Sequence, residues 1–354
     1  MAPYIDPRAK LLWHTDRLDQ LKQTGKTSAP INVEIDLSNR CSHGCSWCHF
    51  SYTHTRGPWA GKVKRPIDAE SGGDLMPLAL VKSILRQLAA VGVRSVTWSG
   101  GGEPTLHPQF DEIIATHALE QGLYSHGGHI DEKRAALLKQ ACTWVYISLD
   151  ECDPTSFKAS KGVDRFMDVL RGIARLVKAE GKATIGLGFL LHRDNYHRVD
   201  DMVTLGKSLG VDYIQFRPVV RYDQKRPGTL AEDTGWVTEA IRRLRPWTLE
   251  EMVSVDIERF ELYRSWMGHP YKTCHWTAVQ TVITPNGKVW RCANKREHAG
   301  AEIGDLTQES FSDIWQRASQ SCAVDGDCRI MCRGHLSNLT LDAVLTQPAH
   351  ENFI

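Results

Sequence analysis

Residues 31–48 read INVEIDLSNRCSHGCSWC, a segment in which a strand-like stretch runs directly into three cysteines. The alternation of apolar and polar residues in INVEIDL is typical of a β-strand, and Cys41, Cys45 and Cys48 follow it with the spacing C-x3-C-x2-C. Thiolates suit iron–sulfur clusters, and three of them bind three irons of a 4Fe–4S cube. The fourth iron then lacks a protein ligand, and an open metal position is where chemistry takes place. On spacing alone, a zinc site completed by His43 is the alternative.

Strand-like and helix-like stretches alternate from residue 31 to about residue 220. Strand character is found at 31–37, 93–99, 144–150, 183–191 and 211–220, and helical periodicity at 77–91, 110–121, 132–141, 166–180 and 199–209. Strands separated by helices of this length favour βαβ units and a parallel sheet. About six such units fit before residue 220, short of the eight in a full barrel. The predicted fold class is therefore α/β, with a partial (β/α)6 TIM-like barrel.

The pattern changes after residue 222, which divides the chain into four expected parts. Residues 1–30 are an N-terminal extension, 31–222 the barrel, 223–265 a connecting segment on the substrate side, and 266–354 a small C-terminal domain. In this domain QTVITPNGKVWRC predicts a β-hairpin, because Asn-Gly is a strong turn signal. The domain also carries five cysteines, which we call the tail cysteines: Cys274, Cys292, Cys322, Cys328 and Cys332.

Composition narrows the class of protein. The 354 residues are 42% apolar and 24% charged, which is typical of a globular protein. No apolar run approaches the roughly 20 residues that span a bilayer, and the N-terminal stretch lacks the apolar core of a signal peptide. We therefore expect a cytoplasmic protein without a membrane partner. In a reducing cytoplasm ten cysteines favour metal or catalytic roles over disulfides, and a formal net charge of +1 argues against tight binding to nucleic acid.

The cysteine motif resembles that of the radical S-adenosylmethionine (radical SAM) superfamily. Members carry C-x3-C-x-aromatic-C after the first barrel strand, and Trp47 fills the aromatic position here. The family's Gly-Gly-Glu-Pro motif after the second strand is matched by Gly101, Gly102, Glu103 and Pro104. The resemblance implies that this backbone and Glu103 hold the amino group of the methionine moiety. It also implies that the amine and carboxylate of SAM chelate the open iron, and that an electron from the cluster releases a 5′-deoxyadenosyl radical.

Further positions at strand ends resemble cofactor contacts of the family. Ser148 and Asp150 correspond to residues near the ribose, Asn195 to a polar residue after the fifth strand, and Arg217 to a group that meets the methionine carboxylate. The other interpretation of each is a polar residue that caps a strand or helix. Cys152, next to the expected active-site rim, is a candidate hydrogen donor to a substrate radical, or else a packing residue.

The C-terminal domain resembles the SPASM and shorter twitch extensions, which bind auxiliary iron–sulfur clusters. EIGDLTQESFSDIW resembles the helical linker of that extension. Five thiols ligate one cube with one to spare, so the resemblance implies one auxiliary 4Fe–4S cluster on Cys274, Cys292 and two of the other three tail cysteines. A second cluster would need another ligand such as His335 or His350. A structural zinc site on four tail cysteines is the alternative.

The resemblance implies a radical SAM enzyme but does not name its substrate. The roughly 30 residues before the first strand are too few for a separate peptide-binding domain. We therefore expect a small molecule (a sugar, aminocyclitol, nucleotide or amino-acid conjugate) that is oxidised, epimerised, eliminated or isomerised. The alternatives are a maturase of a ribosomally made peptide, an enzyme that modifies a base in nucleic acid, and a metal-bearing binding protein without catalysis. The expected electron donor is a flavodoxin or ferredoxin.

Overall fold

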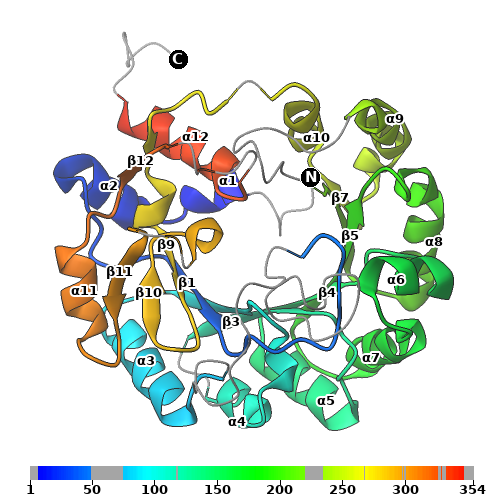
Figure 1. Ribbon diagram of the computed structural model, residues 1–354, viewed down its shortest axis with the longest axis horizontal. Helices are drawn as coiled ribbons and strands as arrows, with labels where there is room; N and C mark the ends of the chain where they lie inside the picture. Colours follow the sequence, from blue (N-terminus) through cyan, green and yellow to red (C-terminus); the bar gives the residue numbers. More distant parts are fainter. Residues whose placement is uncertain are drawn as a thin grey trace.

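The structure, a computed structural model, describes residues 7–48, 75–116, 119–219, 234–266, 268–296, 298, 300–325, 328 and 332–346. Among these residues a curved sheet of ten strands runs in the order β11-β10-β9-β1-β2-β3-β4-β5-β6-β7 (Figure 1). Its first parallel series consists of β1 (Asn32–Asp36), β2 (Ser95–Ser99), β3 (Glu120–Ser125), β4 (Trp144–Ser148), β5 (Thr184–Leu191), β6 (Tyr213–Pro218) and β7 (Val253–Val255). Within the described ranges β11 and β7 do not pair, so the predicted α/β fold with a partial, open barrel is confirmed.

Helices α3 to α9 form an arc outside the sheet (Figure 1). In α7 the buried side chains include Phe166, Val169, Ile173 and Leu176, which lie on one helix face and pack toward the strands. None of the described helices is long and apolar enough to cross a membrane. The helix bounds are α1 (Pro7–Leu11), α2 (Thr15–Thr24), α3 (Leu78–Ala90), α4 (Phe110–Ile114), α5 (Glu132–Ala141), α6 (Pro154–Lys161), α7 (Phe166–Lys178), α8 (Val199–Leu209), α9 (Gly235–Leu244), α10 (Ile257–Arg264), α11 (Phe311–Arg317) and α12 (His335–Leu345).

The interior of the barrel holds a cavity of about 560 Å³ with polar and aromatic walls. Two glycines of β5 make room for two tyrosines that line this cavity. A Cβ on Gly186 would lie 2.1 Å from the ring of Tyr213, and a Cβ on Gly188 would lie 1.9 Å from the hydroxyl oxygen of Tyr146. The rings of these tyrosines therefore occupy the space that side chains of β5 would fill in a packed barrel.

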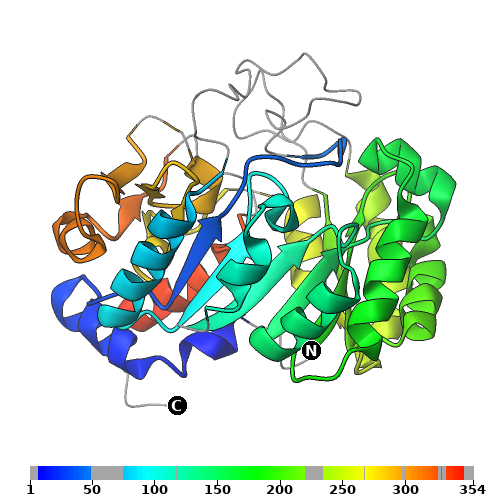
Figure 2. The ribbon, with the colours of Figure 1, turned by 90° about the horizontal axis from the view of Figure 1, so that it is seen from below.

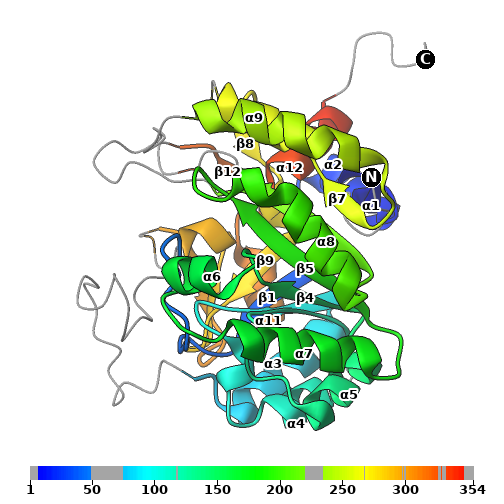
Figure 3. The same cartoon turned by 90° about the vertical axis from the view of Figure 1, so that its right-hand side faces the viewer.

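The C-terminal hairpin continues the barrel sheet. Its first strand, β9, pairs in parallel with β1, so that Asn32 lies opposite Gln280 and Ile35 opposite Ile283 (Figure 3). The turn that follows places Gly287 at φ 82°, a left-handed conformation that glycine adopts without strain. The remaining strands are antiparallel to their neighbours, and the bounds are β8 (Thr273–Cys274), β9 (Gln280–Ile283), β10 (Lys288–Trp290), β11 (Glu302–Asp305) and β12 (Cys322–Ala323).

Two elements differ from the sequence-based expectation. The helix expected at 110–121 ends at Ile114, and β3 occupies the end of that range. β3 begins with polar residues, so its sequence does not show the apolar pattern of a strand. Glycine is required at Gly122, because a Cβ there would lie 2.1 Å from the indole of Trp144. The segment 223–265 contributes β7, which extends the parallel series beyond the six expected strands.

Candidate functional site

The loop that leaves the carboxyl end of β1 lies at the end of the barrel where active sites assemble (Figure 2). It carries three cysteines. They are Cys41, Cys45 and Cys48, and all three side chains are partly exposed. The loop rests on the end of α6, because Gly44 N donates to Lys161 O (2.7 Å) and Ser46 N donates to Ser160 O (3.0 Å). Carbonyl groups at a helix end have no partner within the helix, so the cysteine loop completes α6.

The Gly-Gly-Glu-Pro motif at 101–104 packs against this cysteine loop. Gly102 N donates to Ser38 O (2.9 Å) and Glu103 N donates to Arg40 O (2.8 Å). A Cβ on Gly102 would lie 2.2 Å from Arg40 O, so only glycine permits the approach. The two motifs that carry the family resemblance are therefore joined through their backbones, and they form one cradle at the end of β1 and β2.

The carboxylate of Glu103 is enclosed at the base of this cradle. The side chain is 3% exposed, and its Oε1 accepts hydrogen bonds from Thr105 N (3.1 Å), Thr105 Oγ1 (2.6 Å) and Ser125 Oγ (2.7 Å). Oε2 accepts one from His126 N (2.8 Å). Burial raises the pKa of Glu103, but the neighbouring His126 and these hydrogen bonds outweigh it and hold the pKa below its ordinary value. Glu103 is thus an ionised carboxylate whose Oε2 has room for one more donor.

His126 links Glu103 to the cysteine loop. Its Nδ1 accepts a hydrogen bond from Gly128 N (3.0 Å), so the proton of the neutral ring is on Nε2. This Nε2 lies 3.7 Å from Glu103 Oε2 and 3.1 Å from Ser42 Oγ. His126 therefore connects the ends of β2 and β3 with the loop that carries the first three cysteines.

His126 belongs to a group of histidines of which sequence reasoning considered only His43. His43, considered above as a zinc ligand, stacks on His126 with ring centroids 3.9 Å apart. His129 Nε2 lies 3.1 Å from Ser42 Oγ. The signal in the sequence was SHGGH at 125–129, because polar residues directly after a barrel strand lie at the active-site end.

We expect the unfolding free energy of the iron-free protein to decrease as the pH falls from 6.5 to about 4. Burial lowers the pKa of His126 from 6.5 to about 4, so the unfolded chain binds a proton that the fold rejects. The contribution of His126 is complete above pH 6.5 and is lost as the pH falls toward 4. Urea unfolding at several pH values measures the slope, and His126→Asn should flatten it. An equal slope in both proteins would contradict this assignment.

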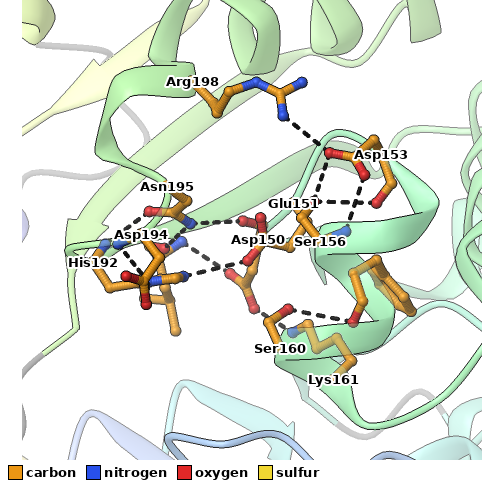
Figure 4. Close-up of polar contacts among 12 residues, drawn as sticks. Asp150, Glu151, Asp153, Ser156, Ser160, Lys161, His192, Asp194, Asn195 and Arg198 are labelled. Carbon is orange, nitrogen blue, oxygen red and sulfur yellow. Dashed lines mark hydrogen bonds and ion pairs between the residues drawn. The ribbon is translucent and has the colours of Figure 1, made fainter.

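The end of β4 carries a buried ion pair between Asp150 and Lys161 of α6 (Figure 4). Asp150 Oδ2 also accepts a hydrogen bond from Ser148 Oγ (3.1 Å), and Oδ1 accepts one from Leu190 N (2.9 Å). Asp150 has φ 65°, in the left-handed region that Asp tolerates better than most residues. The two predicted ribose contacts, Ser148 and Asp150, therefore lie together, and the carboxylate of Asp150 is occupied by protein partners.

Asn195 ties the loop after β5 to the same strand end. Its Oδ1 accepts from His192 N (2.8 Å), and its Nδ2 donates to Asp150 O (3.2 Å) (Figure 4). His192 Nε2 lies 3.3 Å from Glu151 Oε1, and the ring of His192 packs against Trp47 of the cysteine loop at 5.1 Å between centroids. The structure thus brings the strand-end candidates of β4 and β5 to the cysteine loop through Trp47.

Arg217 and Cys152 lie elsewhere. Arg217 lines the barrel cavity, where its guanidinium donates to the hydroxyl of Tyr146 (2.6 Å). Its enclosed Nε has no hydrogen-bond partner among the described residues. Cys152 packs partly buried against the apolar core, and burial raises its pKa to about 11. Cys152 is therefore a protonated thiol at neutral pH. Its packing against the core is also what a structural cysteine without a catalytic role would show.

The tail cysteines share one neighbourhood. Cys274 of β8 lies opposite Cys322 of β12 in an antiparallel pair. The contact with Cys322, burial, and the charges of Cys332 and Cys292 raise the pKa of Cys274. Burial and the charges of Cys292 and Cys328 raise the pKa of Cys332. All are free thiols. Free thiols, which ionise to thiolates, are the donor type that an iron–sulfur cluster requires, so the chemistry of the tail cysteines fits such a cluster.

Other candidate ligands of the tail are accounted for differently. His335 is buried, and its Nδ1 lies 3.0 Å from the hydroxyl of Tyr271 and 3.3 Å from His269 Nδ1. His350 lies outside the described residues. Within the described ranges no three His, Cys, Asp or Glu side chains are grouped to hold a single metal ion.

Comparison with family models identifies both parts of the chain. Residues 35–206 match the model of the radical SAM superfamily, and residues 274–333 match SPASM, described as an iron–sulfur cluster-binding domain. Among curated proteins, the PqqA peptide cyclase of Xanthomonas campestris pv. campestris (strain 8004) is 26% identical over 302 residues, which cover 81% of this chain and 73% of that protein. The PqqA peptide cyclase of Streptomyces rochei is 25% identical over 350 residues, which cover 91% and 89%.

Solved structures share the fold. Streptococcus suis SuiB bound to S-adenosylmethionine aligns with a TM-score of 0.62 and 16% identity, covering 88% of this chain and 72% of that one. Native anSMEcpe with bound AdoMet and Cp18Cys peptide aligns with a TM-score of 0.59 and 18% identity, covering 82% and 81%.

The expectation of a small-molecule substrate is wrong. The curated relatives are named peptide cyclases, and SuiB has also been solved with its precursor peptide SuiA. The expectation depended on the length of the stretch before the first strand. The anSMEcpe chain, 81% of which is covered by this fold, has been solved with a bound peptide.

Proposed function

Because the chain belongs to the radical SAM superfamily and carries a SPASM iron–sulfur domain after its barrel, we propose that it modifies a ribosomally made peptide. The likeness to PqqA peptide cyclases, which extends over 81% of the chain, is the main support. The protein is an enzyme of 4Fe–4S clusters and S-adenosylmethionine, which together supply, when bound, a 5′-deoxyadenosyl radical that takes a hydrogen atom from the substrate. The electron comes from a flavodoxin or ferredoxin in this proposal.

The cradle at the ends of β1 and β2 holds the cofactors in this proposal. The first cluster is ligated by Cys41, Cys45 and Cys48. Glu103 Oε2 accepts a hydrogen bond from the ammonium of the methionine moiety. A buried, ionised carboxylate is the partner that an ammonium requires. Ser148 and Trp47 line the nucleoside side of the same cradle. Asn195 and Asp150 position the backbone of the strand ends in this proposal, because their side chains are already hydrogen-bonded to backbone atoms of the protein.

The barrel cavity receives a side chain of the peptide. Its volume of about 560 Å³ is within the range of ligand pockets. Its wall combines Tyr146 and Arg217 of the barrel with Trp276, Arg333 and Leu336 of the tail. Arg333 directly follows the tail cysteine Cys332 in the sequence. A substrate group in this cavity therefore contacts both the barrel and the domain that carries the tail cysteines.

The test is peptide-dependent cleavage of S-adenosylmethionine. The protein is reconstituted anaerobically with iron and sulfide, reduced, and incubated with short peptides encoded beside its gene. We expect one of them to accelerate the formation of 5′-deoxyadenosine and to change mass by an amount that reports the bond formed or the hydrogen lost. Iron-free protein is the control. If 5′-deoxyadenosine forms at the same rate with and without every such peptide, and no peptide changes mass, the proposal of a peptide substrate fails.

A further inference from the structure

A buried ion pair beside the cysteine loop has no role in the function described so far. Lys161 is 2% exposed and Asp150 is 0% exposed, and the two side chains form a salt bridge (Figure 4). Taking both charges out of water is costly, so a buried pair adds little stability by itself. Its place in the fold, against the loop that carries the first cysteines, indicates another role.

The main chain at Lys161 fixes the position of Cys45. Lys161 O accepts from Gly44 N (2.7 Å), and Ser160 O accepts from Ser46 N (3.0 Å), so a hydrogen bond holds the chain on each side of Cys45. The helix ends there with Gly162 at φ 70°. A displacement of the end of α6 would therefore move Cys45 with it.

The side chain of Lys161 brings a positive charge to the same place. Nζ lies 5.5 Å from the centroid of the Trp47 ring, on the cysteine loop. The ammonium of Lys161 therefore lies beside the loop that carries Cys45 and Cys48.

A buried positive charge favours the more negative state of a neighbouring redox group, because the interior screens charges poorly. The reduced state of an iron–sulfur cluster carries one more negative charge than the oxidised state. Potentials of such clusters are known to depend on the charge and hydrogen bonds around the thiolates. The ammonium of Lys161 therefore acts in the direction that makes the first cluster easier to reduce.

We infer that Lys161 is a positioning residue of the first cluster, which fixes Cys45 through its main chain and raises the reduction potential of the cluster through its charge. The inference rests on the assignment of Cys41, Cys45 and Cys48 as ligands under the proposed function. It does not depend on the nature of the substrate. Asp150 keeps the ammonium in place, and its carboxylate also accepts hydrogen bonds from Ser148 Oγ and Leu190 N.

The test compares variants of Lys161 by the midpoint potential of the first cluster. Lys161→Gln removes the charge and keeps the main-chain carbonyl. We expect the potential, followed by electron paramagnetic resonance during a reductive titration, to shift to a more negative value. The first cluster is recognised by the change of its signal on addition of S-adenosylmethionine. Lys161→Arg keeps a positive charge and is expected to stay near the wild-type potential.

Lys158→Gln is the matched control. Lys158 is on the same helix, but its side chain is exposed and pairs with Asp164 at the surface (3.1 Å), so no shift is expected. Thermal melting of the iron-free proteins and the iron content after reconstitution verify folding and cluster assembly. Lys161→Met serves as the second neutral variant should Lys161→Gln fold poorly.

An unchanged potential in the neutral variants overturns the inference, and so does an equal shift in Lys161→Arg. A loss of affinity for S-adenosylmethionine at unchanged potential would assign the ammonium to the cofactor instead. None of these measurements uses a peptide. A failure to find a peptide substrate therefore leaves the inference standing, and an unchanged potential leaves the proposed function standing.

Discussion

Gly102→Ala is expected to reduce the formation of 5′-deoxyadenosine by about 100-fold or more, since a displacement of about 1 Å near a reacting centre suffices for such a loss. The new Cβ would lie 2.2 Å from Arg40 O and 2.6 Å from the carbonyl carbon of Arg40. Both are backbone atoms, so neither can rotate away. The two loops must separate, and the hydrogen bond from Glu103 N to Arg40 O (2.8 Å) breaks. Glu103 and the first cysteines then no longer face the same cofactor.

The measurement is chromatography of 5′-deoxyadenosine after anaerobic reconstitution and reduction. Gly25→Ala is the control, because Gly25 has φ 70° and a Cβ there meets nothing within 4 Å. It introduces backbone strain of about 1 kcal/mol without touching the site. This control is expected to melt slightly earlier and to cleave S-adenosylmethionine at the wild-type rate. Wild-type cleavage by Gly102→Ala would show that the contact between the two loops is not required.

Glu34→Gln is expected to lower the unfolding free energy by about 3–5 kcal/mol, the usual cost of leaving a buried charge without its partner. Glu34, on β1, is 2% exposed and forms salt bridges with Arg296 and Arg333 of the tail. Arg296 is itself 3% exposed and also contacts Asp36 (Nε to Oδ2, 3.1 Å). Because these arginines lie near tail cysteines in the sequence, we also expect less auxiliary cluster per chain. Denaturant unfolding and iron analysis measure the two effects.

Lys288→Met is the control for this pair of effects. Lys288 on β10 pairs with Glu302 on β11 (2.7 Å), and both side chains are about one-third exposed. Removing such a pair costs less than about 1 kcal/mol, because water screens it. If Glu34→Gln unfolds at the same denaturant concentration as Lys288→Met, the buried network does not hold the tail to the barrel.

The part of the site that sequence could predict consists of local motifs. Cys41, Cys45 and Cys48 follow a strand within a few residues, and Gly102 and Glu103 follow the next strand, so each motif is complete within one loop. The open barrel follows in the same way from the alternation of strands and helices. Each of these features depends on neighbours in sequence, which is the information that periodicity and spacing carry.

The parts that sequence could not predict depend on contacts between distant segments. From the sequence, Lys161 is expected to be an exposed lysine near a helix end. Only the fold buries it against Asp150 and the cysteine loop. His126 gains its meaning from Glu103, which belongs to another strand end. The cavity formed jointly by barrel and tail likewise has no signature in either segment alone.

The parallel pairing of β9 with β1 has a practical consequence for protein engineering. A chimera that grafts the tail of a relative onto this barrel must reproduce the register from Asn32–Gln280 to Ile35–Ile283. Otherwise the grafted strand will not pair with β1. Deleting the tail would turn β1 into an edge strand, with unpaired backbone groups that invite aggregation. The tail is therefore not an exchangeable module, and libraries that aim to change specificity should vary the walls of the cavity and leave this seam intact.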